Sequence, residues 1–164
     1  MRHALLLAPL ITATTAIAGE PADTHTWPDR RHAELAGQYR GTIRESRLTG
    51  QTCEYLHAEL TLRYAGSGTD AERDYSLLLS CPADPAWTER RLRSHWWVDK
   101  IGDSCLILKP TAGHPIDQDP EKLYGFRIDD DGRALRQDGN SCEAADERYE
   151  RAVLMRVPAR TDTD

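Results

Sequence analysis

The segment Tyr55-Leu-His-Ala-Glu-Leu-Thr-Leu-Arg-Tyr64 alternates without a break between apolar and polar side chains. A period of two residues indicates a β-strand that has one face in a core and the other in water. The preceding segment, residues 35–44, is expected to supply another strand, in which Gly37 and Gly41 bracket Tyr39 and suit a close approach of a second backbone. The expected core face of the alternating strand comprises Leu56, Ala58, Leu60, Leu62 and Tyr64, and its wet face comprises His57, Glu59, Thr61 and Arg63.

Short segments of the same kind continue toward the C-terminus and are separated by turn residues. A glycine-rich stretch at 65–70, Pro82-Ala-Asp-Pro85 and Asp129-Asp-Asp-Gly132 each predict a turn. No long helical period interrupts the series. The expected strands span residues 37–44, 55–64, 74–81, 92–99, 105–108, 122–128, 133–136 and 149–157.

Eight short strands joined by tight turns predict an all-β fold. A meander of this size removes its exposed edges by closing, so we expect a small antiparallel up-and-down β-barrel of about eight strands, of the kind that lipocalins form. The alternative is an open sandwich of two sheets. Side chains fill the interior of an eight-stranded barrel, or it holds one small ligand.

The N-terminus has the features of a cleavable export signal. Arg2 and His3 precede an apolar stretch, and Ala16-Ile-Ala18 forms an Ala-x-Ala cleavage site. The residue directly after this site is Gly19 and not a cysteine, so we expect no lipid anchor and a periplasmic or secreted protein. The expected organisation is a signal peptide at 1–18, a flexible leader at 19–34, a barrel domain at 35–157 and a tail at 158–164.

The composition argues against nucleic acid as the partner. The formal net charge of the 164 residues is −6, and removal of the signal takes away only Arg2, which leaves −7. Phosphate contacts require a basic surface, which this chain lacks overall.

All four cysteines lie after the expected cleavage site, and an even count in an oxidising compartment predicts two disulfides. In an up-and-down path, Cys53 opens the second strand and Cys81 closes the third, so these two are expected to pair. Cys105 and Cys142 are then left to pair with each other. The long spacings differ from those of zinc or dithiol redox motifs.

A sequence of short motifs runs through the domain: Gly37-x-Tyr-x-Gly-Thr42, a polar loop with a cysteine, Leu60-Thr-Leu62, Tyr75-x-Leu77, a tryptophan strand, Cys105-Leu-x-Leu108, Tyr124-x-Phe126 and Leu154-x-Arg156. This order resembles the N-terminal β-barrel of the NlpE copper-resistance and envelope-stress lipoproteins. The resemblance implies an NlpE-like barrel over residues 35–157 and a role in the cell envelope. It departs from the family at the lipid anchor and at the family's Cys-x-x-Cys, where Gly50 stands at the first position and Cys53 at the second.

His57 and Glu59 are the candidate metal ligands. Residues two apart on a strand share a face and can present two ligands to one ion, and copper accepts imidazole together with thiolate or carboxylate. The alternative is that both are ordinary solvated side chains, because no third ligand is near in sequence.

The segment from Arg90 to Trp97 is the one locally basic stretch of an acidic chain. If Trp96 faces inward, then Arg91, Arg93, His95 and Trp97 share the outer face and predict a partner-binding patch. The alternative is that the arginine stems merely cover an outward-facing tryptophan.

No nucleophile motif and no phosphate-binding glycine loop is present, so we expect a non-catalytic protein without a required cofactor. The leading hypothesis is a monomeric, exported binding protein for an envelope protein or for a small ligand at the barrel mouth. The alternatives are a copper-handling protein and an inhibitor or immunity protein for a secreted hydrolase.

Overall fold

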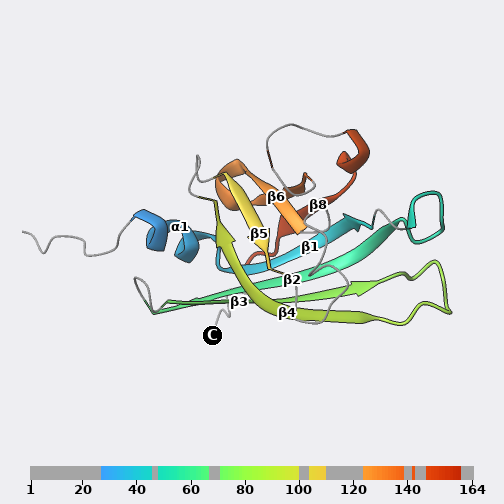
Figure 1. Ribbon diagram of the computed structural model, residues 1–164, viewed down its shortest axis with the longest axis horizontal. Helices are drawn as coiled ribbons and strands as arrows, with labels where there is room; N and C mark the ends of the chain where they lie inside the picture. Colours follow the sequence, from blue (N-terminus) through green and yellow to red (C-terminus); the bar gives the residue numbers. More distant parts are fainter. Residues whose placement is uncertain are drawn as a thin grey trace, which may run out of the picture.

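Eight antiparallel strands close into a barrel in which each strand pairs with its neighbours in sequence and β8 returns to β1 (Figure 1). The computed structural model describes residues 27–45, 48–66, 71–99, 104–109, 124–138, 142 and 147–159. The predicted all-β, up-and-down barrel is confirmed, and the open sandwich is wrong. The expected signal peptide, residues 19–26 of the leader and most of the tail lie outside the described residues.

The strands keep the predicted order. They are β1 (Gly37–Arg44), β2 (Tyr55–Ala65), β3 (Glu72–Ser80), β4 (Arg90–Val98), β5 (Cys105–Leu108), β6 (Tyr124–Asp129), β7 (Ala134–Gln137) and β8 (Val153–Arg156). The last strand is shorter than the expected 149–157, because Glu147–Tyr149 forms a 3-10 turn, η6, closed by a hydrogen bond from Glu150 N–H to the Glu147 carbonyl.

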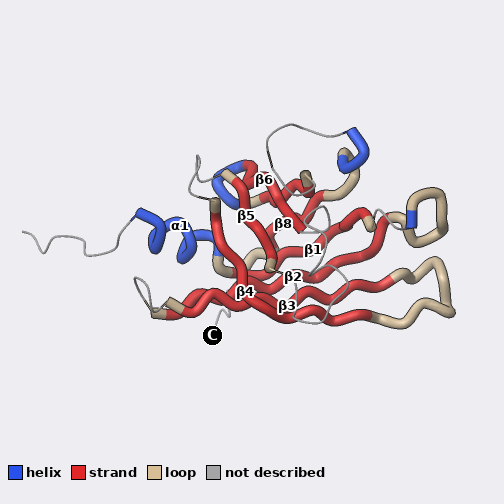
Figure 2. Tube along the Cα trace, in the orientation of Figure 1, coloured by secondary structure: helices blue, strands red, loops and turns tan. Residues whose placement is uncertain are grey.

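The two sides of the barrel differ in length. β1, β2 and β3 pair over eight and nine residues, whereas β4–β5, β7–β8 and β8–β1 each pair over three. Figure 2 shows the result, with long curved strands on one side and short strands crossing above them. We call the end where β1 begins the helix end and the opposite end the mouth.

The alternation in sequence places one face of each strand in the core, as expected. Along β2, Leu56, Ala58, Leu60 and Leu62 are buried, and His57, Glu59 and Arg63 are exposed. A shift of one residue in the register would send all four apolar side chains into water, so burial fixes the pairing. The largest fully buried side chains are Trp96, Tyr39, Phe126, Leu35, Ile43, Leu56, Leu60, Leu77, Leu79, Leu106, Leu108 and Leu135.

A helix, α1 (Trp27–Leu35), covers the helix end, where the sequence predicted an irregular leader. The prediction was wrong for these residues because tertiary contacts, and not a strong helical period, hold the helix. His32 is 5% exposed, accepts a hydrogen bond at Nε2 from Val98 N–H at 3.3 Å, and packs against the rings of Tyr64 and Trp96.

The end of α1 is fastened to both β1 and the β6–β7 turn. The Tyr39 hydroxyl lies 2.9 Å from the Leu35 carbonyl oxygen and 3.0 Å from that of Gly132, and it donates to one of them at a time. Burial raises the pKa of this hydroxyl, which keeps it a donor.

Gly132 has φ +86°, and a Cβ there would lie 2.8 Å from Leu35 Cδ2, so the predicted Asp-Gly turn also needs glycine for space.

Gly41 lets β8 approach β1 closely. A Cβ at this position would lie 1.9 Å from the Val153 carbonyl oxygen. The close backbone approach expected at this glycine is therefore confirmed, and it occurs where the barrel closes.

Gln137 completes the closure at the mouth, on the side of the seam where β8 has not yet begun. Its side-chain Oε1 accepts a hydrogen bond from Arg44 N–H at 2.7 Å, and its Nε2 donates to the Arg44 carbonyl at 3.1 Å. The side-chain amide thus stands in for a strand beside the last residue of β1. Gln137 is 5% exposed, so no water replaces these bonds freely.

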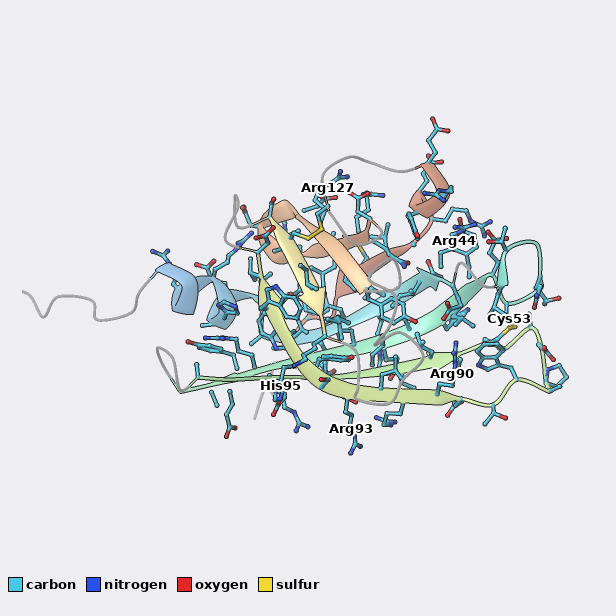
Figure 3. All side chains as sticks on the ribbon, in the orientation of Figure 1. Arg44, Cys53, Arg90, Arg93, His95 and Arg127 are labelled. Carbon is cyan, nitrogen blue, oxygen red and sulfur yellow. A yellow bond between two sulfur atoms is a disulfide. The ribbon has the colours of Figure 1, made fainter. Side chains whose placement is uncertain are left out.

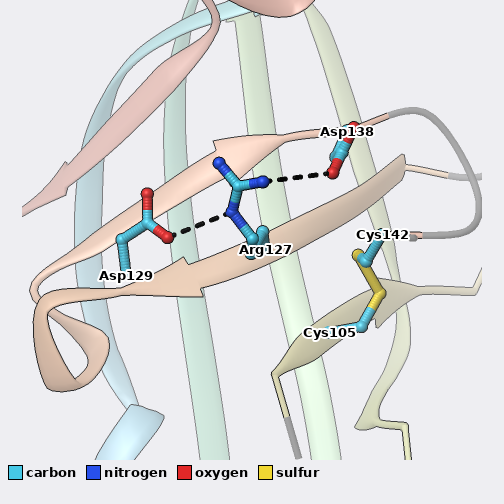
Figure 4. Close-up of a disulfide and its surroundings, with 5 residues drawn as sticks. All are labelled: Cys105, Arg127, Asp129, Asp138 and Cys142. Carbon is cyan, nitrogen blue, oxygen red and sulfur yellow. Dashed lines mark hydrogen bonds and ion pairs between the residues drawn. A yellow bond between two sulfur atoms is a disulfide. The ribbon is translucent and has the colours of Figure 1, made fainter. Parts of the chain in front are cut away.

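Both predicted disulfides are present. Cys53–Cys81 joins the β2 and β3 ends at the mouth, with Cα atoms 5.8 Å apart, and Cys105–Cys142 has a Cα separation of 5.7 Å. Figure 4 shows the second bridge beside Arg127, the residue that pairs with Cys105 across β5 and β6. The pairing across opposite strand ends is possible because β5, β6 and β7 span only four to six residues each.

Replacing Gln137 by Leu is expected to destabilise the barrel by about 2–6 kcal/mol, because it leaves the buried Arg44 N–H and carbonyl without partners at about 1–3 kcal/mol each. Urea denaturation measures this change. The control is Gln38→Leu, at an exposed position of the same β1 strand, which should change the free energy of unfolding by less than about 0.5 kcal/mol. Equal effects of both substitutions would contradict the role assigned to Gln137.

Candidate functional site

The outer face of β2, β3 and β4 carries the basic side chains singled out from the sequence. Arg91, Arg93 and His95 are exposed, Trp97 is half-buried on the same face, and Trp96 is 1% exposed and points inward. Figure 3 shows Arg93 and His95 pointing away from the barrel. The predicted orientation of β4 is therefore confirmed, whereas partner binding by this face stays a prediction.

The strand register brings residues of β2 and β3 next to this segment. Thr61 on β2 pairs with Ser76 on β3, which pairs in turn with Arg93 on β4. One row toward the helix end, Arg63 pairs with Asp74. These side chains share the outer face because every second residue of a strand points the same way.

An open depression of about 470 Å³ lies at the centre of this face. Its lining comes from all three strands: Thr61, Arg63, Asp74, Tyr75, Ser76, Arg91, Arg93 and Ser94. His95 and Trp97 of the predicted patch lie outside this lining. We call the combined set Arg63, Arg91, Arg93, His95 and Trp97 the arginine face.

Sequence reasoning missed Arg63, Thr61 and Ser76 as members of the site. Arg63 was assigned correctly to the wet face of β2, but its neighbours on β3 and β4 follow from the register alone. The β2–β3 turn lies between the two strands, and its length fixes which residues stand opposite each other. A turn assignment for residues 65–70 does not by itself give that offset.

Some of the basic side chains on the outer face of the sheet lie against a carboxylate, and others do not. His95 Nδ1 lies 2.8 Å from Asp74 Oδ1, and Arg40 Nε on β1 lies 3.4 Å from Glu59 Oε1. Within the part of the chain that the structure describes, neither Arg63 nor Arg91 forms an ion pair with a carboxylate. The only hydrogen bond of the Arg91 side chain there is a long one, 3.5 Å, from Nη1 to Ser76 Oγ.

His57 and Glu59, the candidate metal ligands, lie on the outer face of β2 as expected, and both are exposed. The Glu59 carboxylate faces Arg40, and Cys53 is held in its disulfide and offers no thiolate. Among the described residues, no group of three or more His, Cys, Asp or Glu side chains is placed to hold one ion. A copper role thus stays a prediction and has no further ligand from the described strands.

The mouth holds a second cluster of polar side chains, which come from the residue after β1 and from the first residues of β4 and β6. Glu45 is 7% exposed, and its Oε2 accepts a hydrogen bond from the Tyr124 hydroxyl at 3.2 Å and lies 3.5 Å from Arg90 Nη2. The Arg90 guanidinium lies 4.8 Å from the centre of the Trp87 ring. Over the described residues, two buried donors here, Arg90 Nε and Trp87 Nε1, have no hydrogen-bond acceptor.

The β1–β2 loop is fastened at the mouth by Glu54. Its Oε2 accepts from Gly50 N–H at 2.8 Å, and its Oε1 accepts from Arg44 Nε at 2.8 Å. The Gly50 hydrogen bond first, and then the Arg44 side chain, hold the pKa of this carboxyl below its ordinary value of 4.5. The ionised form of Glu54 is therefore the one that fits the loop.

Comparison with known proteins adds no assignment. No protein-family model, no curated protein and no solved structure matches this chain. The eight-stranded antiparallel barrel implied by the NlpE resemblance is confirmed, and membership of that family stays a prediction. Among the described residues, no helix combines the length and the apolarity that crossing a membrane requires.

Replacing Glu54 by Gln is expected to change how stability depends on pH. Because the folded pKa is lowered, the ionised carboxylate stabilises the fold above its ordinary pKa of 4.5, and this contribution disappears as the pH falls through the lowered folded value. The wild type should therefore lose more stability than the variant between about pH 5 and pH 3, as measured by urea midpoints.

Glu89→Gln is the matched control, because Glu89 is exposed and makes no hydrogen bond within the described residues. Its profile should follow that of the wild type. Parallel profiles for the wild type and Glu54→Gln would refute the assigned role of this loop contact.

Proposed function

We propose that this protein is an exported, non-catalytic binding protein that captures an acidic partner protein of the cell envelope through the arginine face. The observation that carries the proposal is the pair of exposed guanidinium groups, Arg63 and Arg91, neither of which forms an ion pair with a carboxylate of the described residues. They lie on one face of a protein whose formal net charge is −6. In an otherwise acidic protein, such a local excess of positive charge favours an acidic surface as its complement.

The composition of the arginine face suits protein recognition. Arginine and tryptophan are over-represented among the residues that dominate binding energy, and Trp97 contributes a half-buried aromatic ring at one end of the face. The sheet beneath is rigid, because β3 is hydrogen-bonded to strands on both sides. Such a surface binds with little loss of backbone entropy.

The covalent structure supports an extracytoplasmic location. The chain is a disulfide-bonded small β-barrel, and every described cysteine belongs to a disulfide. Stable disulfides indicate an oxidising compartment. The expected signal peptide and the NlpE-like order of motifs support the cell envelope as the place of action.

The double variant Arg91→Ala with Trp97→Ala is expected to lose partner capture, because it removes one exposed guanidinium group and the tryptophan of the face. The test immobilises wild-type and variant protein, passes an envelope extract over both, and identifies the retained proteins by mass spectrometry. A partner with an acidic surface should be retained at least about tenfold less by the variant, which corresponds to about 1.4 kcal/mol.

The matched control is Arg40→Ala with Met155→Ala. These residues pair across β1 and β8, and they also combine an exposed arginine with an exposed apolar side chain, since Met155 is 52% exposed. This control should retain the partner like the wild type. Unchanged capture by the Arg91 and Trp97 variant would reject the arginine face as the binding surface.

A further inference from the structure

We propose that the depression within the arginine face is a seat for a single carboxylate group that projects from an acidic polypeptide. The carboxylate seat consists of Thr61, Arg63, Ser76 and Arg91. This inference rests on the proposed function and adds to it the chemical group that is recognised and the residues that select it.

The register places two guanidinium groups on either side of one hydroxyl. Ser76 stands opposite Thr61 on β2 and opposite Arg93 on β4. Arg63 and Arg91 occupy the diagonal positions on these two neighbours, one toward the helix end and one toward the mouth. Directly opposed residues in a sheet lie about 5 Å apart and diagonal ones about 7–8 Å apart, so long side chains at both diagonals reach the space above Ser76.

The donors in this space exceed the acceptors that the described chain supplies. A guanidinium carries five N–H groups and no acceptor, and a hydroxyl both donates and accepts. Arg91 makes one weak contact to Ser76 Oγ at 3.5 Å, and Arg63 is exposed. Asp74 is the one carboxylate in the lining, and its Oδ1 lies 2.8 Å from His95 Nδ1.

The missing acceptor is best supplied by a carboxylate. Its two coplanar oxygens match the planar fork of a guanidinium, and the match is stronger when both partners are charged. Two guanidinium groups that form no ion pair within the described residues and lie on either side of one hydroxyl favour an anion over a neutral amide or hydroxyl.

The shape of the depression favours a group attached to a polypeptide over a free small molecule. Its volume of about 470 Å³ is within the range of small-ligand sites, but it is open to solvent and lies on the outside of the barrel. Such a site buries one projecting side chain and leaves the remainder of the partner on the surrounding sheet face. Trp97, outside the depression, is available to that remainder.

The test measures binding of a fluorescent hexaglutamate peptide by anisotropy at about 50 mM salt, where surface charges are weakly screened. Two variants, Arg63→Ala and Ser76→Ala, probe the seat without touching the residues changed in the capture experiment. We expect Arg63→Ala to weaken binding about tenfold, Ser76→Ala to weaken it severalfold, and hexaglutamine to show no binding. Arg40→Ala, on the same sheet but outside the depression, should bind like the wild type.

All variants are on the outer face, so equal urea midpoints will show that folding is preserved. Wild-type affinity for hexaglutamate in Arg63→Ala and Ser76→Ala would overturn the seat, even if the arginine face still captures its partner. Tighter binding of inorganic phosphate than of hexaglutamate would overturn the assignment to a polypeptide carboxylate. The proposed function is tested by the capture experiment with the Arg91→Ala, Trp97→Ala variant, and the seat is tested by peptide binding to Arg63→Ala and Ser76→Ala. The two experiments use different variants, so failure of the seat and failure of the proposed function are distinguishable.

Discussion

The whole structure depends on the seam between β1 and β8, where the sheet meets its own first strand. Only three residue pairs form this seam, and they exist because Gly41 presents no side chain to the β8 backbone. Beyond the last pair, the Gln137 amide satisfies both backbone groups of Arg44. Without these contacts, β1 would be an exposed edge with unpaired amides, which is a site for aggregation.

Closure at the seam sets the curvature of the long strands and, with it, the arginine face. β2, β3 and β4 bend around a core of leucine and aromatic side chains, and their registers hold Thr61, Ser76 and Arg93 in one row. The inner face fixes these registers because a slip of one residue would bury the charges. The exposed side chains of the arginine face are therefore positioned by apolar residues on the other side of the same strands.

The sequence predicted the fold closely, because alternation and turn residues are local signals. The apolar face of β2, the inward direction of Trp96 and both disulfides follow from such signals and from strand order. The site was predicted only in part, since Arg91, Arg93 and His95 alternate along the single strand β4, whereas Arg63 and Ser76 join them through pairing between strands. α1 was missed for a similar reason: His32 is held by Val98, Tyr64 and Trp96, all distant in sequence.

The unequal lengths of the strands have a consequence for the order of folding. β1 to β4 form a continuous meander in which each strand pairs with the next, so they require only short loops to close. The seam instead brings together Thr42 and Arg151, which are 109 residues apart. Its formation therefore costs more loop-closure entropy than a hairpin does and forms fewer hydrogen bonds. We therefore expect the long hairpins to be formed in the folding transition state and the seam to form after it. In mutational folding kinetics, the fraction of a substitution's destabilisation that already appears in the transition state should then be higher for Leu60 than for Leu154.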